Sequence, residues 1–151
     1  MNNSIPFIEL NELTIDGLRD LKFILIGAHG NSSLLFQIQV ESLQPLKWFI
    51  DNEPFIRNEE LEYSNASDLG YAEFINQLFD TISDEEEYQF WEYRSRHGIH
   101  FAFEGYDVPR IYIGRFNNTH YISCDEADLK FNFEIDIESF FSEIHKKLND
   151  F

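Results

Sequence analysis

The sequence predicts an α+β domain with a mostly antiparallel sheet or sheets and about three helices packed on one face. Three observations lead to this class. Alternating apolar segments lie towards both ends of the chain, helical periodicity occupies its middle, and short turns separate successive strands. With 151 residues, 43% of them hydrophobic and 17% aromatic, the chain is long enough to bury a core. We therefore expect residues 1–151 to form a single domain.

The N-terminal part is expected to form a β-hairpin preceded by an edge strand. Residues 7–10 are a short apolar fragment, which suggests the edge strand. Residues 21–27 and 33–40 are strand-like, and the glycine and asparagine residues of segment 28–31 supply turn chemistry between them. Two strands joined by so short a turn pair in antiparallel fashion.

Two more strands are expected before the first helix. After Pro45, residues 46–50 are mostly apolar and predict a third strand, followed by a turn at residues 51–54. Residues 58–63 are rich in glutamate and predict a fourth strand at a sheet edge, where charged side chains stay in water.

The middle of the chain predicts two consecutive helices. In the first, Ser67 or Asp68 is the expected cap, and the apolar positions follow the i, i+3, i+4 spacing of one buried stripe. These positions are Tyr71, Phe74, Ile75, Leu78, Phe79 and Ile82. Ser83 and Glu86 then form a capping-box pattern, so residues 84–96 are expected to be a second helix, ended by Gly98.

The C-terminal part returns to strands and ends in a helix. Strands are expected at residues 99–104, 110–116, 119–124 and 129–137, the middle two joined by a tight turn at Asn117 and Asn118 and the last two by an acidic turn. Phe140, Phe141, Ile144 and Leu148 share one side of the expected last helix.

The charge of the chain is strongly acidic, with 28 acidic against 11 basic residues and a formal net charge of -17. Nucleic acids and anionic membranes are bound through Lys and Arg, so direct contact with either is not expected. A basic protein is the complementary partner, because long-range attraction raises its association rate. The alternative is that the acidity only keeps an aromatic-rich domain in solution.

The cysteine count and the N-terminus bear on location. Cys124 is the only cysteine, so an intramolecular disulfide is excluded and a reducing compartment is expected. The first ten residues have no basic region followed by a long apolar run, and the longest apolar stretch covers only residues 23–26. These features predict a cytoplasmic protein without membrane contact.

The residue types that could carry catalysis or bind a metal show no spacing typical of an active site or a metal site. His97 and His100 would be the most plausible metal pair, but no zinc motif accompanies them, so we interpret them as surface histidines and expect no metal or cofactor. Cys124 and His120 lie roughly 13 Å apart along one strand, too far for a nucleophile pair. Cys124 is expected to be a small, partly buried apolar residue. We expect no enzyme; the alternative is one that uses unpatterned carboxylates or the two histidines.

Acidic clusters in turns and at helix starts are the main candidates for partner contact. They lie at positions 59, 60 and 62, at 84–87, at 125, 126 and 128, and at 134, 136 and 138. Tyr63, Tyr88 and Tyr121 accompany three of them. Carboxylates pair with Lys and Arg, and aromatic rings supply the buried area of an interface hot spot. The alternative is that each cluster consists of solvated turn residues and helix caps.

In size, acidity, aromatic content and α+β layout, the whole chain resembles the immunity proteins of bacterial polymorphic toxin and contact-dependent growth inhibition systems. Residues 83–93 and 121–128 carry the resemblance, without a signature motif. It implies a cytoplasmic protein that neutralises a cognate toxin domain, often a basic nuclease, by covering its active or substrate-binding site. The residues expected to contact the toxin are Asp84, Glu85, Glu86, Glu87, Tyr88, Trp91, Tyr121, Asp125, Glu126 and Asp128. The alternative function is a small acidic regulatory or adaptor domain that binds another cellular protein.

Overall fold

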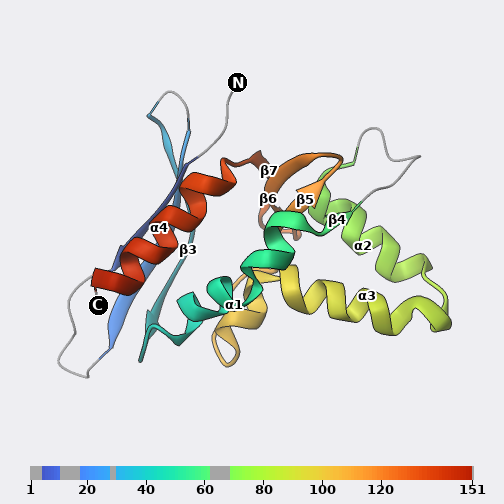
Figure 1. Cartoon of the computed structure of the whole chain (residues 1–151), viewed down its shortest axis with the longest axis horizontal. Helices are drawn as coiled ribbons and strands as arrows, with labels where there is room; N and C mark the ends of the chain where they lie inside the picture. The colour runs from blue at the N-terminus through green and yellow to red at the C-terminus, as the bar shows by residue number, and fades with distance from the viewer. Residues whose placement is uncertain (1–4, 11–17, 28–29, 62–68, 151) are drawn as a thin grey trace.

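A computed structural model of the chain describes residues 5–10, 18–27, 30–61 and 69–150, and strands within these ranges form two sheets (Figure 1). The first sheet has the order β1-β2-β3 and is antiparallel; its strands are β1 (Ile5–Leu10), β2 (Arg19–Ile26) and β3 (Ser32–Val40). The second has the order β4-β5-β6-β7; its strands are β4 (Glu60–Leu61), β5 (Ile111–Phe116), β6 (Thr119–Asp125) and β7 (Lys130–Glu134). In this sheet β4 runs parallel to β5, and the other pairs are antiparallel.

Four α-helices and one 3-10 helix lie within the described ranges. They are α1 (Gln44–Asn58), α2 (Tyr71–Thr81), α3 (Asp84–His97), η1 (Ile99–Phe103) and α4 (Ile137–Asp150). The α+β class is confirmed, with four α-helices where about three were expected. Figure 1 shows α4 lying along the first sheet, α2 and α3 forming a hairpin beside the second, and α1 between these two parts. No described helix is both long enough and apolar enough to cross a lipid bilayer.

The expected strand at residues 46–50 is wrong, because this run forms the first turns of α1. Pro45 stands in the first turn of the helix, where its missing N–H has no intrahelical partner to lose. Leu46, Phe49 and Ile56 are buried at helical spacing. A five-residue apolar run fits either a strand or a buried helix, and packing decides between them. The expected turn at 51–54 is therefore absent, and Pro54 lies inside the helix.

The expected strand at residues 99–104 is also wrong. These residues form η1, in which Ile99 and Phe103 are buried. The expected edge strand at residues 58–63 is confirmed only for Glu60–Leu61, which lie at the edge of the second sheet; Glu62 and Tyr63 lie outside the described residues. The last strand is shorter than expected, because β7 ends at Glu134 and α4 begins at Ile137.

Several local expectations are confirmed. The two middle helices lie where their periodicity placed them, and the turn between β5 and β6 holds Asn117 and Asn118 at φ values of 49° and 68°. Ser83 is the N-cap residue of α3, but its side chain makes no capping hydrogen bond, so the expected capping box does not form. The caps expected for α2, Ser67 and Asp68, lie outside the described residues, and Gly70 precedes the helix.

The side chains of β5 separate two apolar cores. Ile111 and Ile113 join the larger core, which β2, β3, α1 and α4 build around Phe23. Tyr112 and Phe116 point the other way, into a second core with residues of α2 and α3. Helices therefore lie on one face of the first sheet but contact both faces of the second. This arrangement places α3 at the outside of the molecule, with its inner side on the second core.

Candidate functional site

The helix α3 has an inner and an outer side of different character. Phe90, Tyr93 and His97 are its buried residues and face the second sheet. The positions 84, 87, 88 and 91 follow the i, i+3, i+4, i+7 spacing on the opposite side of the helix. We call these four residues the outer stripe of α3: Asp84, Glu87, Tyr88 and Trp91. The stripe places two large aromatic rings and two carboxylates on one solvent-facing surface.

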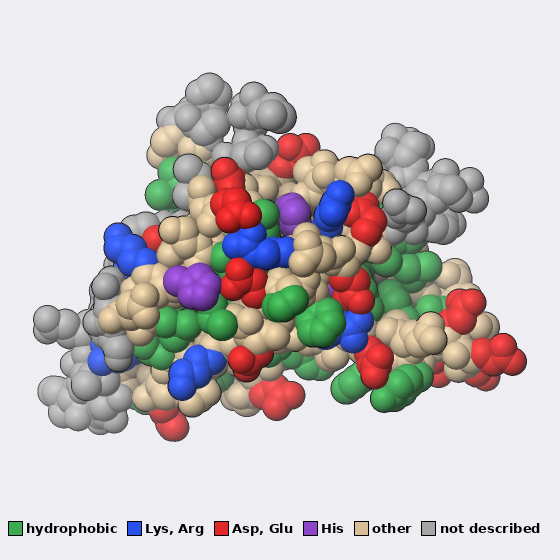
Figure 2. All heavy atoms as spheres, viewed as in Figure 1, with side chains coloured by type: hydrophobic (Ala, Val, Ile, Leu, Met, Phe, Trp, Pro, Cys, Tyr) green, Lys and Arg blue, Asp and Glu red, His purple; other side chains and the backbone are tan. Residues whose placement is uncertain are grey.

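Both aromatic rings of the outer stripe are unusually exposed. The exposed fraction is 70% for Tyr88 and 53% for Trp91. The indole of Trp91 contacts Phe101 of η1 edge-on, with 6.3 Å between ring centroids, so its position is fixed from one side only. The four acids Asp84, Glu85, Glu86 and Glu87 are all exposed in the first turn of the helix. Figure 2 shows acidic side chains gathered over this end of the α2–α3 hairpin.

The acids of the turn between β6 and β7 lie at a different hollow. Its volume is ≈ 640 Å³, and it is lined by Asn76, Phe79, Asp80, Arg110, Asp125, Glu126, Ala127 and Asp128. Asp125 accepts a hydrogen bond from the Asn76 side chain and lies 3.5 Å from Lys130, and Glu126 accepts the backbone N–H of Arg110. Two of the three predicted contact acids in this turn therefore tie it to α2 and to the segment before β5.

Tyr121 is separate from both acidic groups. It lies on β6, half-buried, opposite Glu134 of β7, and its ring contacts Phe116 edge-on at 6.2 Å. Partial burial, and then the nearby Glu134 carboxylate, raise the pKa of its hydroxyl. The predicted contact residues thus lie on several elements, and those of α3 are the ones that share an exposed helical face.

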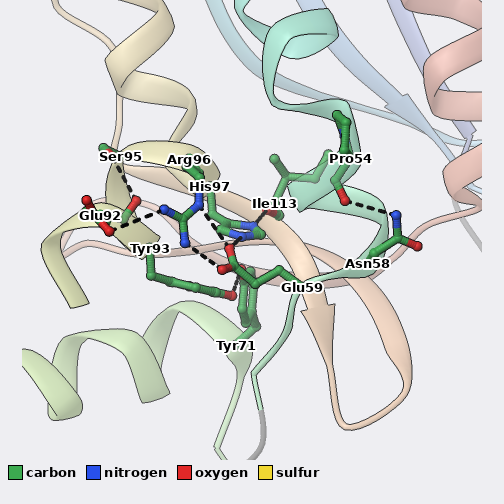
Figure 3. A network of polar contacts seen from close by, with 10 residues as sticks. All are labelled: Pro54, Asn58, Glu59, Tyr71, Glu92, Tyr93, Ser95, Arg96, His97 and Ile113. Carbon is green, nitrogen blue, oxygen red and sulfur yellow. Dashed lines mark hydrogen bonds and ion pairs between the residues drawn. The ribbon is translucent and has the colours of Figure 1, made fainter. Parts of the chain in front are cut away.

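A polar network that sequence reasoning missed lies behind α3 (Figure 3). The carboxylate of Glu59 accepts hydrogen bonds from Nε and Nη2 of Arg96, and from Nε2 of His97 at 2.7 Å. Nδ1 of His97 lies 2.8 Å from the carbonyl oxygen of Ile113. A carbonyl oxygen and a carboxylate are both hydrogen-bond acceptors, so the His97 ring bridges two acceptor groups. The network therefore joins the end of α1, α3 and β5.

The interpretation of His97 as a surface histidine is wrong, because its side chain is fully buried. The ring of Tyr93 stacks on it at 4.0 Å, and the Tyr93 hydroxyl lies 2.5 Å from that of Tyr71. Burial raises the pKa of both tyrosine hydroxyls well above the ordinary value. A Cβ at position 114 would lie 2.3 Å from the Tyr71 hydroxyl oxygen and 2.7 Å from Nδ1 of His97, so this position in β5 requires glycine.

Partial burial acts to raise the pKa of the Glu59 carboxyl, but the hydrogen bonds from His97 and Arg96 outweigh it. The pKa therefore lies below its ordinary value, and the carboxylate is the stable form. The signals for this network in the sequence were weak. They were a glycine inside a strand and an i, i+4 pair of Tyr93 and His97 in a helix with no clean apolar stripe.

The other groups considered for chemistry lie apart. His100 is half-buried, and burial together with the nearby Arg94 and Arg110 lowers its pKa to about 4. Cys124 is buried, and burial followed by the nearby Glu126 raises the pKa of its thiol to about 11, which agrees with the expected apolar role. Within the described part of the chain, His, Cys, Asp and Glu side chains form no group of three or more suited to hold a metal ion.

An open groove lies between β4 and the side of α3. Its volume is ≈ 570 Å³, and we call it the α3–β4 groove. It is lined by Glu59, Glu60, Leu61, Ile82, Glu86, Gln89, Phe90, Glu92, Tyr93 and Arg96. The buried network forms one wall, and the edge of the second core forms the floor.

Comparison of the chain with family models, curated proteins and solved structures finds no match in any of the three. The functional conclusion therefore depends on the residues and contacts of this chain. The outer stripe and the α3–β4 groove together present aromatic area and carboxylates to solvent, on two sides of one helix.

Proposed function

We propose that this protein is a cytoplasmic immunity protein that binds a basic bacterial toxin domain of nuclease type and covers its active or substrate-binding site. The observation that carries the proposal is the outer stripe of α3. Tyr88 and Trp91 expose more than half of their side chains there, between Asp84, Glu87 and the neighbouring acids of the same turn.

Exposed rings of this size favour a binding surface over a merely solvated one. Single exposed apolar residues are ordinary, but adjacent large rings on one helical face offer the area that anchors an interface. Tyrosine and tryptophan are the residue types most enriched at interface hot spots. The carboxylates around the rings then favour a partner whose own surface carries Lys and Arg.

The net charge of the chain supports the same partner. A charge of -17 attracts a basic domain over a distance of about one Debye length, about 8–10 Å at physiological salt. A nuclease carries cations around its cleft because its substrate is a polyanion. An acidic protein placed over that cleft competes with the nucleic acid without any catalysis of its own.

The test is a rescue experiment combined with co-purification. The tagged chain is expressed in its native cells, and proteins that co-purify at low salt are identified. We expect a protein with a basic domain that kills cells when expressed alone and is harmless when this chain is co-expressed. A non-toxic partner would contradict the immunity function and favour a regulatory or adaptor domain, and an acidic partner would contradict the charge argument itself.

A further inference from the structure

The α3–β4 groove combines an apolar floor with carboxylates at its rim. Leu61, Ile82 and Phe90 belong to the second core or pack against it, and each also lines the groove. Glu86 and Glu92 of α3 stand at the rim. A floor of this kind suits the aliphatic stem of a long side chain, and the rim suits a cation at its tip.

The carboxylates that line the groove differ in whether a cation of the chain pairs with them. Glu59 is held by Arg96 and His97, and Glu60 lies 2.8 Å from Nε of Arg115. Glu92 is more loosely held: it forms an ion pair with Arg96 at 3.8 Å and a hydrogen bond with the Tyr88 hydroxyl. Within the described ranges of the chain, no cation pairs with Glu86, which is exposed. At the rim, the charge of Glu86 is therefore the one that no described cation of the chain neutralises.

One guanidinium of the chain itself, that of Arg96, already binds at this groove. Arg96 closes one end of it, with two nitrogens on the Glu59 carboxylate and its guanidinium carbon 4.7 Å from the centroid of the Phe55 ring (Figure 3 shows the pairing with Glu59). A carboxylate beside an aromatic face is the environment that Arg prefers over Lys, because the planar group can pair and stack at once. Glu86 and Phe90, one helical turn apart on α3, both line the same groove and offer a second carboxylate near an aromatic ring.

We propose that the α3–β4 groove receives an arginine side chain of the basic partner. The stem of that arginine lies on Leu61 and Phe90, and its guanidinium pairs with Glu86, with Glu92 adding attraction. The inference deepens the proposed function, since it rests on a basic partner docked beside α3. The network ties α3 to Glu59 at the end of α1, directly before β4, so this wall of the groove is in place before the partner arrives.

The test uses the whole chain and a small probe, so it needs no identified partner. A 15N-labelled sample is titrated with N-acetyl-arginine amide and followed by amide chemical shifts. We expect saturable shifts at Leu61, Gln89 and Phe90 with a Kd of about 1 mM, as suits one side chain without its protein. N-acetyl-citrulline amide has the same shape without the charge, and it should cause no saturable shift at these amides.

Matched variants distinguish binding in the groove from attraction by the net charge of the chain. Glu86→Gln with Glu92→Gln should abolish the saturable shifts. Glu41→Gln with Glu104→Gln removes the same two charges at exposed positions elsewhere and should leave them intact. An equal loss in both double variants would overturn the proposal, and so would equal affinity for N-acetyl-lysine amide, which would indicate a site for any cation.

The groove and the proposed function fail in distinguishable ways. If the titration shows no shifts but a toxic basic partner is neutralised, the arginine groove is wrong and the immunity function stands. If the shifts appear but the partner is not a toxin, the groove stands and the immunity function is wrong. In either case a well-dispersed spectrum of each variant shows that the substitutions have left the fold intact.

Discussion

In the folded chain, Nε2 of His97 lies 2.7 Å from Oε1 of Glu59, which joins the last residue of α3 to the residue that caps the end of α1. The two residues are 38 positions apart in sequence. His97 is fully buried, so its Nε2 depends on this carboxylate for a partner, while Nδ1 lies against the carbonyl oxygen of Ile113. The pair therefore ties the C-terminal end of α3 to the end of α1.

Replacing Glu59→Gln should lower the free energy of unfolding by about 1–2 kcal/mol, because it weakens the charge-assisted hydrogen bonds that this half-buried carboxylate accepts from Arg96 and His97. Urea denaturation measures the change as a lower midpoint with an unchanged slope. Glu104→Gln, at an exposed position, is the control and should change stability by less than about 0.5 kcal/mol. A Glu59→Gln midpoint equal to that of the control would show that the network contributes no stability.

Acidification should destabilise the fold in two steps. His100 has a pKa lowered from 6.5 to about 4, so between these values the unfolded chain binds the proton more readily and stability falls as pH falls. The Glu59 carboxyl has a pKa below its ordinary 4.5, so its contribution is present above that value and is lost as pH falls through the folded-state pKa.

His100→Phe tests the first of these steps. The variant cannot titrate, so urea midpoints measured at several pH values between 6.5 and 4 should fall less than those of the original chain. The loss below about pH 4.5 should persist in the variant, because Glu59 is unchanged. The same pH dependence in both proteins from 6.5 to 4 would exclude His100 as its source.

Gly114→Ala should destabilise the protein by about 2–3 kcal/mol, because the new methyl group would overlap the Tyr71 hydroxyl and the His97 ring. Thermal unfolding measures the loss. Adding Tyr71→Phe removes the nearest atom, so the double variant should be more stable than the sum of the two single effects predicts. Strict additivity would show that the backbone moves instead, and would contradict the close approach described here.

Trp91→Ala should weaken binding of the partner by about 2 kcal/mol or more, roughly 30-fold in Kd, if the outer stripe anchors the complex. Its effect on stability should stay near 1 kcal/mol, because half of the side chain is exposed. Leu34→Ala on β3 truncates an equally exposed apolar side chain elsewhere and should leave affinity unchanged. Isothermal titration calorimetry or biolayer interferometry with the purified partner gives the Kd of each variant. Equal Kd values for Trp91→Ala and Leu34→Ala would contradict the role of the outer stripe as an anchor.

Local sequence patterns predicted an element correctly where its structure depends on residues close to it in the sequence. The periodicity of α2 indicated the buried Tyr71, Phe74 and Ile75, but Phe79 of the same predicted stripe is 51% exposed. Asn117 and Asn118 indicated a turn that needs positive φ. The acids after Ser83 marked the start of α3. The same patterns were misleading at residues 46–50 and 99–104, where short apolar runs carry no period long enough to separate a strand from a helix.

The sequence by itself determined the α+β class, the two middle helices and the acidic, aromatic composition of α3, because periodicity, caps and charge are properties of adjacent residues. Only the tertiary structure decided that α1 is a helix, that His97 is buried against Glu59, and which side of α3 faces solvent. These outcomes depend on contacts between residues far apart in the chain. Hydrogen bonding and burial at such distances leave no regular spacing in the sequence.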